Sequence, residues 1–242
     1  VSGAGDVDVL LVSGATDTLD SIVRNNLDLF LSSGKSVFIS QSGVDADIQT
    51  QQVDVIQSDI FDFLGGYNLN LQKNLVLDKK CGSVSVRERR GIFMMNRAME
   101  YPFFPIVDSF NKDEVVVSEI EQAMLFFPSE IKIDTSENEF LAGTVELFTT
   151  SENSGIMEGN WSLSPDPTQN PFIRMLGQQG KILAATSKLV NGGELMLVSD
   201  SKFLSDQSGM SVQDNLVFIM NAVDYLTGDE ELISLRSREI TS

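Results

Sequence analysis

Five residues near the ends of two predicted strands have types and positions suited to ligand binding. They are Ser13, Gly14, Asp17, Asp200 and Lys202. Three of them follow the apolar run at residues 7–12, and two follow the run at residues 194–199. Open α/β sheets bind ligands at the carboxyl ends of their strands, so these five residues form a candidate ligand crevice. In a simpler interpretation, Gly14 forms a turn and Asp17 caps a helix, and neither binds a ligand.

Pairs of carboxylates suggest a second kind of chemistry. Asp45 and Asp47 form one pair, and Asp134 and Glu137 form another. Two carboxyl groups at a fixed separation in a cleft can hydrolyse glycosidic bonds, so a hydrolase that uses acidic residues is one alternative. In a chain with 35 acidic residues, however, such pairs are expected on any solvated face.

The composition excludes several classes of site. The chain has no histidine and one cysteine, which excludes Ser-His-Asp and Cys-His catalysis, histidine-containing zinc sites and an intrachain disulfide. Lys79 and Lys80 could activate Cys81, but a structural role is the simpler interpretation. The net charge of −18 opposes binding to nucleic acid. We predict no catalytic residue, no metal and no cofactor.

An aromatic string offers a candidate contact surface. Residues 101–105 read Tyr-Pro-Phe-Phe-Pro, and the prolines argue against a helix or a central strand. A rigid aromatic segment can present Tyr101, Phe103 and Phe104 to a partner, and these three residues are the candidate partner surface. The same residues could instead fill a core.

The first quarter of the chain predicts a strand–helix–strand unit. Residues 7–12 form a buried parallel strand, and a helix capped by Asp17 or Thr18 continues to Gly34, which takes the left-handed position after it. Residues 36–40 form the second strand. Residues 41–57 are expected to be a polar loop, and residues 58–64 a short helix.

The remainder predicts a strand-rich middle section, from about residue 70 to 180, followed by a return to α/β character. We expect strands at residues 75–77, 83–86, 92–95, 115–117, 123–127 and 144–150, and a long loop at 151–171. A hairpin at residues 181–199 turns at Asn191-Gly192-Gly193. A final helix at 212–226 has an apolar stripe at Leu216, Ile219, Met220 and Val223. Residues 1–242 are read as a single α/β domain.

Several strings occur in the order seen in a known family. They are residues 6–40, 74–86, 101–107, 193–206 (GELMLVSDSKFLSD) and 221–240 (NAVDYLTGDEELISLRSREI). Together they resemble the extracytoplasmic domain of gliding-motility-type ABC transporter auxiliary proteins, the GldG-like family. The last two strings are the most specific, and the resemblance covers nearly the whole chain.

This resemblance implies a Rossmann-like, glutamine-amidotransferase-like open sheet, similar to a domain of intraflagellar transport proteins. It implies the periplasmic side of a bacterial inner membrane, membrane segments outside this chain, and permease and ATPase partners of an ABC-2-type transporter serving gliding motility or export. On that basis residues 236–242 begin a tether toward the membrane. The chain lacks a Walker A motif and the elbow of an active amidotransferase. We therefore expect a non-catalytic subunit, with a periplasmic module for a sugar or peptide as an alternative.

Overall fold

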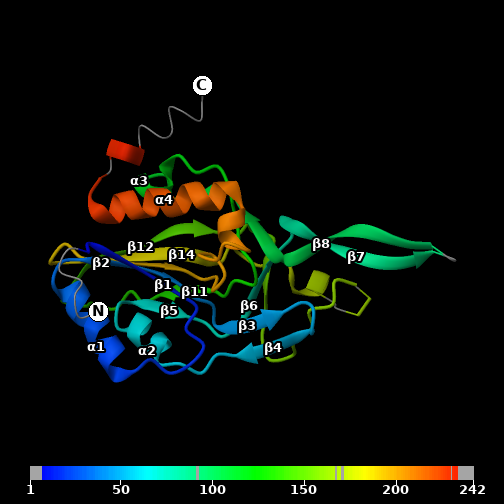
Figure 1. Ribbon diagram of the computed structural model, residues 1–242, viewed down its shortest axis with the longest axis horizontal. Helices are drawn as coiled ribbons and strands as arrows, with labels where there is room; N and C mark the ends of the chain where they lie inside the picture. The colour runs from blue at the N-terminus through cyan, green and yellow to red at the C-terminus, as the bar shows by residue number, and fades with distance from the viewer. Residues whose placement is uncertain (1–6, 91–92, 167, 170–171, 230, 234–242) are drawn as a thin grey trace.

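The structure, a computed structural model, describes residues 7–90, 93–166, 168–169, 172–229 and 231–233. It is a mixed α/β fold rich in strands, with a main sheet and three smaller sheets among the described residues (Figure 1). Helix α4 (Gln213–Thr227) lies on one face of the main sheet. Helices α1 (Ser21–Ser32) and α2 (Ile60–Gly65) lie on the other face.

The main sheet has eight strands in the part of the chain that is described. They are β1 (Val9–Ser13), β2 (Ser36–Ser40), β5 (Leu69–Leu71), β9 (Ser109–Phe110), β11 (Ile131–Ile133), β12 (Leu141–Thr149), β14 (Ile182–Leu189) and β15 (Glu194–Val198). The central path runs β1-β2-β15-β14-β11-β5, with β12 paired to β14 and β9 to β12. The pairs β1–β2 and β2–β15 are parallel, and the other pairs are antiparallel. The predicted strand–helix–strand opening and the hairpin at 181–199 are therefore confirmed.

Two cores lie on opposite faces of this sheet because successive side chains of a strand point to opposite sides. In β2, Phe38 packs in the core beneath α4, while Val37 and Ile39 pack in the core that also holds α1 and α2. In β15, Met196 and Leu197 divide between the same two cores. Central strands buried on both faces read as continuous apolar runs, which is why the sequence identified them.

Three smaller sheets and short helices complete the structure. In the first sheet, β8 (Phe93–Val107) lies between β7 (Cys81–Arg90) and β10 (Ala123–Met124) and pairs with both. The second pairs β6 (Leu75–Asp78) with β13 (Ser154–Met157), and the third pairs β3 (Val44–Asp47) with β4 (Gln52–Val55). The short helices are α3 (Val115–Ser118), η1 (Phe172–Met175) and η2 (Gly209–Ser211). A third core lies among these sheets. Strands β5 to β13 all lie between Leu69 and Met157, which confirms a strand-rich middle section, whereas the single domain over residues 1–242 stays a prediction.

The opening unit differs from its prediction in two details. Asp20, not Asp17 or Thr18, caps α1, because its Oδ1 accepts a hydrogen bond of 2.9 Å from the backbone N–H of Ile22. Strand β1 is an edge strand rather than a buried one, and Leu11 is half exposed. Gly34 does take the left-handed position after α1, with a φ of +82°.

Two segments have a different secondary structure from the predicted one. Residues 41–57 contain the β3–β4 hairpin instead of a loop, since Val44 and Ala46 alternate with aspartates and only the apolar residues are buried. Residues 115–117 form helix α3 instead of a strand. There the Nζ of Lys112 donates to the carbonyl oxygens of Val117, Ser118 and Ile120, which satisfies acceptors that the helix end leaves open.

The buried face of α4 matches the predicted stripe only in part. Ile219 is buried as predicted, but Leu216 and Met220 are partly exposed, and Phe218 and Ala222, outside the stripe, are fully buried. Asn215 sets this rotation, because its side chain accepts from the N–H of Met124 at 2.9 Å and donates to the carbonyl of Met124 at 2.7 Å. Residues 236–242, the predicted tether, lie outside the described residues.

Candidate functional site

The predicted ligand crevice brings four of its five residues to one edge of the main sheet. The Oγ of Ser13 donates to the carbonyl of Ser201 at 3.2 Å, and Gly14 adopts a left-handed φ of +54° against the same residue. Asp200 and Lys202 continue from the end of β15. Asp17 is exposed and lies on the loop before α1. Four of the five residues therefore lie near the carboxyl ends of the parallel strands, as expected.

The polar groups of this edge are already bonded within the chain. The carboxylate of Asp200 is fully buried and accepts backbone N–H bonds from Phe126 at 2.8 Å and Lys202 at 2.7 Å. Burial raises the pKa of Asp200 to about 7. The ammonium of Lys202 donates to the carbonyl of Ala46 at 2.9 Å and lies over the ring of Phe127. These contacts join β15 to the smaller sheets, and ligand binding at this edge stays a prediction.

Sequence reasoning missed the residues that complete this network. The Oε1 of Gln41 accepts from the N–H of Ala15 at 2.6 Å, which holds the loop after β1. The hydroxyl groups of Ser42 and Ser201 lie 2.7 Å apart, and Ser129 accepts from the N–H of Gly43 at 2.8 Å. Serine and glutamine are common on polar surfaces, so their types alone give no signal that they are buried here.

The structure contradicts the candidate partner surface at two of its three residues. Tyr101 and Phe103 are fully buried in the third core. The hydroxyl of Tyr101 donates to the carbonyl of Leu163 at 2.8 Å, and burial raises its pKa. Phe104 is half-buried, with its ring centroid 4.9 Å from that of Tyr101. The string lies in β8, where the prolines are tolerated because the β7–β8 register shifts between Cys81 and Ser83.

Cys81 fits a structural role. Its side chain is partly buried, and burial raises the pKa of the thiol to about 11. A thiol with that pKa is protonated at neutral pH and is a poor nucleophile. Among the residues that the structure describes, no group of three acidic or cysteine side chains is arranged to hold a metal ion.

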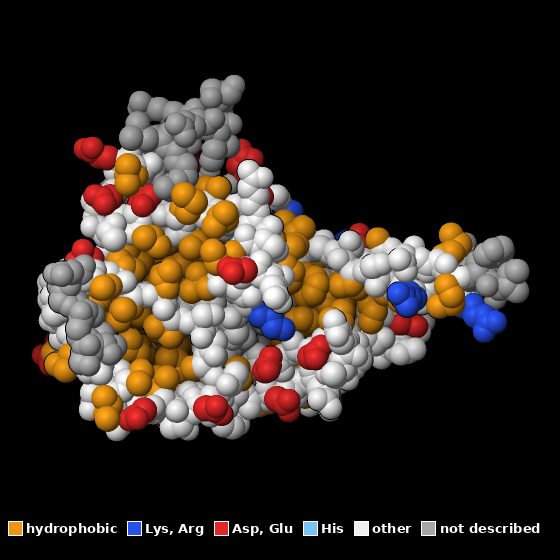
Figure 2. Space-filling view, in the orientation of Figure 1, with side chains coloured by type: hydrophobic (Ala, Val, Ile, Leu, Met, Phe, Trp, Pro, Cys, Tyr) orange, Lys and Arg blue, Asp and Glu red, His pale blue; other side chains and the backbone are white. Residues whose placement is uncertain are grey.

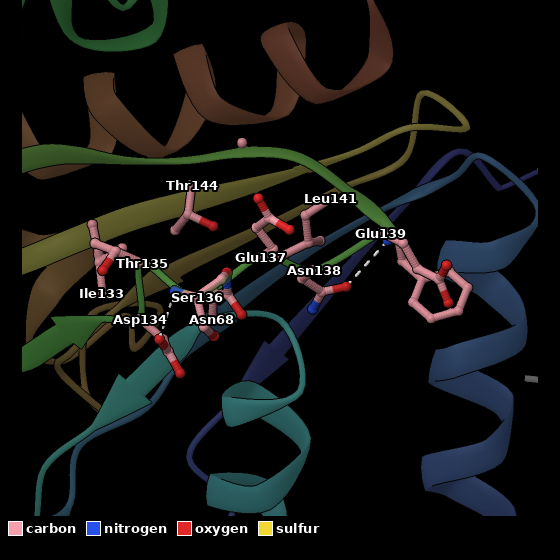
Figure 3. Close-up of a pocket in the computed structure, with 12 residues that line it drawn as sticks. Asn68, Ile133, Asp134, Thr135, Ser136, Glu137, Asn138, Glu139, Leu141 and Thr144 are labelled. Carbon is pink, nitrogen blue, oxygen red and sulfur yellow. Dashed lines mark hydrogen bonds between the residues drawn. The ribbon is translucent and has the colours of Figure 1, made fainter.

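A polar hollow opens beside the loop between β11 and β12 (Figure 3). Its volume is about 880 Å³. It is lined by Asn68, Ile133, Asp134, Thr135, Ser136, Glu137, Asn138, Glu139, Phe140, Leu141, Gly143 and Thr144. The acidic pair Asp134 and Glu137, recognised in the sequence, lies here.

Hydrogen bonds hold the loop of this hollow to the turn after α2. The amide of Asn68 donates to the carbonyl of Ser136 at 3.2 Å, and the amide of Asn138 donates to the carbonyl of Gly66 at 3.1 Å. Within the loop, the Oδ1 of Asn138 accepts from the N–H of Phe140 at 3.1 Å (Figure 3). The loop is therefore a preformed surface.

The carboxylates of the hollow are poorly suited to acid–base catalysis. Asp134, Glu137 and Glu139 are all exposed. A hydrogen bond from the backbone N–H of Ser136 lowers the pKa of Asp134. A general acid needs a raised pKa, and the shift of Asp134 is in the opposite direction.

A second, more apolar groove adjoins the hollow and shares Phe140 with it. Its volume is about 560 Å³. It is lined by Arg24, Asp28, Ser32, Asp62, Phe63, Gly66, Tyr67, Phe140, Leu189, Val190 and Asn191. The hydroxyl of Tyr67 donates to Asp28 at 2.9 Å, so helix α1 and the turn after α2 are tied together at its base.

Two exposed apolar side chains stand side by side between these depressions. Phe140 is 66% exposed and Val190 is 65% exposed. The backbone N–H of Val190 donates to the carbonyl of Phe140 at 3.1 Å, so the two residues are neighbours. We call this region, with the hollow and the groove, the Phe140 surface. The signal for it in the sequence is a lone phenylalanine that follows the polar run at residues 134–139.

Comparisons with known proteins agree with the sequence strings. The model of the family described as "ABC-type uncharacterized transport system" matches residues 2–222. An uncharacterized protein of Borreliella burgdorferi (strain ATCC 35210 / DSM 4680 / CIP 102532 / B31) is 25% identical over 97% of this chain and 48% of its own length. The chain thus spans about half the length of this curated relative.

One solved structure has a similar fold. The "mmIFT52 N-terminal domain" matches 93% of this chain and 80% of its own, with a TM-score of 0.59 and 12% sequence identity. At that identity the likeness concerns the fold alone. It agrees with the expected similarity to a domain of intraflagellar transport proteins.

Proposed function

The chain belongs to the ABC-type uncharacterized transport system family, and from this premise we propose that it is a non-catalytic binding subunit. Membership of the family indicates a role in an ABC-type transport system. The Phe140 surface carries the proposal, since it is a preformed surface with exposed apolar side chains at its centre. Such patches mark sites of interaction between proteins. The partners we propose are the permease and ATPase subunits of an ABC-2-type transporter.

The finer parts of the proposal concern location and fold. We propose that the domain faces the periplasm, that segments outside this chain anchor it, and that the system serves gliding motility or export. No helix among the described residues is long and apolar enough to cross a membrane. The parallel strands β1, β2 and β15, with α1 between the first two, support kinship with Rossmann-like and amidotransferase-like sheets.

Co-purification tests the partnership. The full-length protein is purified in mild detergent with its permease and ATPase, and we expect it to retain both. The double variant Phe140→Asp/Val190→Asp should reduce retention about tenfold or more, because charge enters the centre of the contact. Ile173→Asp, at a residue on η1 that is 64% exposed, is the matched control and should retain both subunits. Clean separation of the wild-type protein from both subunits would contradict the proposal.

A small-ligand role is the second candidate. The hollow holds amides, hydroxyls and carboxylates within about 880 Å³, a size and polarity that suit a sugar or a short peptide. A thermal-shift screen of sugars and peptides is expected to give hits that Asn138→Ala abolishes. An absence of hits would remove this candidate. A hydrolase is supported less, because the carboxylates of the hollow are exposed and the pKa of Asp134 is lowered.

A further inference from the structure

The outer part of the β7–β8 hairpin projects from the molecule as a two-stranded arm (Figure 1). We define the arm by its paired strand residues, 83–89 of β7 and 94–100 of β8. At about 3.3 Å per residue, seven paired residues extend roughly 23 Å. This distance exceeds the screening length of about 8 Å at physiological salt, so the charge of the body is largely screened at the end of the arm.

The arm has the opposite charge balance to the rest of the chain. Residues 83–100, from the first to the last residue of the arm, contain four arginines, Arg87, Arg89, Arg90 and Arg97, and two acidic residues, Glu88 and Glu100. Removing these from the totals of 17 basic and 35 acidic residues leaves 13 against 33 elsewhere. A solvated surface of this protein is therefore acidic by default, and the arm departs from that default.

Apolar side chains are exposed toward the end of the same arm. Met94 is 64% exposed and Met95 is 54% exposed. Successive residues of a strand point to opposite faces, so each face of the ribbon carries one of these methionines. Figure 2 shows basic and hydrophobic side chains together toward the end of the arm.

Each face places an arginine beside its methionine. Met94 pairs with Arg89 across the ribbon, and Met95 shares its face with Arg97, two residues further from the tip. That spacing is about 7 Å along the strand. The guanidinium of Arg97 lies 3.9 Å from Glu88 and its side chain remains 62% exposed.

We propose that the arm binds the surface of an anionic lipid bilayer, with Met94 and Met95 at the level of the upper acyl chains and the arginines at the phosphates. Interfacial binding needs apolar area near the tip and cationic groups a few ångströms behind it, and the arm supplies both. A guanidinium forms paired hydrogen bonds with phosphate oxygens. Each basic residue near an anionic surface strengthens binding roughly fivefold.

The distribution over both faces favours lipid over a protein partner. A protein partner that docks on a ribbon covers one face, and the other face would then keep its methionine in water. A bilayer surrounds an inserted tip on all sides, so methionines on both faces leave water together. This inference concerns the chain alone and does not depend on the transporter subunits proposed above.

Vesicle sedimentation tests the proposal with the chain as it is. Vesicles of phosphatidylcholine are compared with vesicles containing about one-third phosphatidylglycerol. We expect the chain to sediment with the anionic vesicles and to lose that binding in high salt. Arg87→Glu/Arg97→Glu and Met94→Ser/Met95→Ser should each weaken partitioning about tenfold or more. The chain contains one tryptophan, Trp161, so Met95→Trp adds a reporter whose emission should shift to shorter wavelength on anionic vesicles.

Matched controls separate the arm from overall charge and hydrophobicity. Lys79→Glu/Lys132→Glu changes the net charge by the same amount and should bind like the wild type. Ile22→Ser/Leu29→Ser removes apolar residues of α1 that are 65% and 67% exposed, and should also bind normally. Circular dichroism checks that each variant is folded. Equal sedimentation with both kinds of vesicle, no sedimentation, or controls as weak as the arm variants would overturn the proposal. Arm-dependent self-association without lipid, seen by sedimentation velocity, would overturn it in favour of a second copy.

Discussion

Strand β2 of the main sheet and strand β8 of the arm both point successive side chains to opposite faces. The side chains of β2 are buried on both faces, whereas apolar side chains of β8 in the arm are exposed on both. In β2, Phe38 enters one core while Val37 and Ile39 enter another, and none of the three is exposed. In the arm, Met94 and Met95 also point to opposite faces, and both meet solvent. Packing explains the apolar residues of the sheet. Packing within the chain leaves those of the arm unexplained, so their explanation lies in what the arm contacts.

The largest effect on stability is expected from a substitution in the core beneath α4. Phe218 of α4 is fully buried and makes edge contacts with Phe38, Phe148 and Phe203. Phe218→Ala should lower the free energy of unfolding by about 3–5 kcal/mol, because it removes a buried ring and leaves a cavity. Denaturant unfolding measures the loss.

Phe140→Ala is the control for that measurement, since it removes the same ring from a position that is 66% exposed. It should change the free energy of unfolding by about 0.5 kcal/mol or less. Equal losses in the two variants would contradict the division between core and surface phenylalanines.

The next effect concerns pH and the buried carboxylate at the end of β15. Burial raises the pKa of Asp200 in the folded chain from 3.8 to about 7. A raised folded pKa means that the folded chain binds the proton more tightly, so stability falls as pH rises between about 4 and 7. At about 1.4 kcal/mol per pKa unit, a rise from 3.8 to about 7 corresponds to roughly 4 kcal/mol.

Unfolding of the wild type and Asp200→Asn at pH 5 and pH 8 measures this contribution. The wild type should lose stability relative to the variant as the pH rises. Asp134→Asn should show no change in this range and the opposite sign only below about pH 4, because the folded pKa of Asp134 is lowered from 3.8 and its contribution is lost as the pH falls below that value. A gap between wild type and Asp200→Asn that is constant with pH would show that the buried carboxylate does not titrate in this range.

A smaller effect is expected where α3 meets β14. The Nζ of Lys188 lies 2.8 Å from Glu114, and its side chain is 36% exposed. Burial opposes the charge on Lys188, but the hydrogen bond and charge of Glu114, together with the interactions with Tyr225, outweigh it and the pKa is raised. Lys188→Met should cost about 1–2 kcal/mol, less than a fully buried pair would, because solvent screens the partners. Glu114→Gln/Lys188→Met should recover part of the loss in thermal unfolding. A single variant as stable as the wild type would contradict this.

The sequence predicted the fold best where a strand is buried on both sides. Residues 37–39 and 195–198 are continuous apolar runs, and both lie in the expected strands. The α4 stripe was predicted only in part: Ile219 is buried, but Leu216 and Met220 are not. Asn215 is buried through its bonds to Met124, and periodicity counts an asparagine as a surface residue. Helix α3 was predicted as a strand because β-branched propensity takes no account of Lys112, whose ammonium satisfies the carbonyls of Val117 and Ser118.

The candidate site was harder to predict than the fold. The crevice residue Ser13 does reach the segment after β15, where its Oγ donates to the carbonyl of Ser201, since the ends of parallel strands share an edge. The polar groups of Ser13 and Asp200 bond to backbone groups far along the chain, which spacing cannot reveal. The Phe140 surface arises because β12 and β14 pair, with Leu141 opposite Leu189, and so bring Phe140 beside Val190. Whether a single phenylalanine is exposed depends on the tertiary structure, and the local sequence does not predict it.

The smallest effect on stability is expected from substitutions of the exposed methionines of the arm. Met94→Ser/Met95→Ser should change the free energy of unfolding by about 0.5 kcal/mol or less, because both side chains are largely exposed in the folded chain as well as in the unfolded one. Chemical unfolding without lipid measures this. The same variant should lose binding to anionic vesicles, so that stability and binding separate at these two residues. A loss of stability comparable with that of Phe218→Ala would mean that the methionines pack within the protein, and the contrast between arm and sheet would no longer hold.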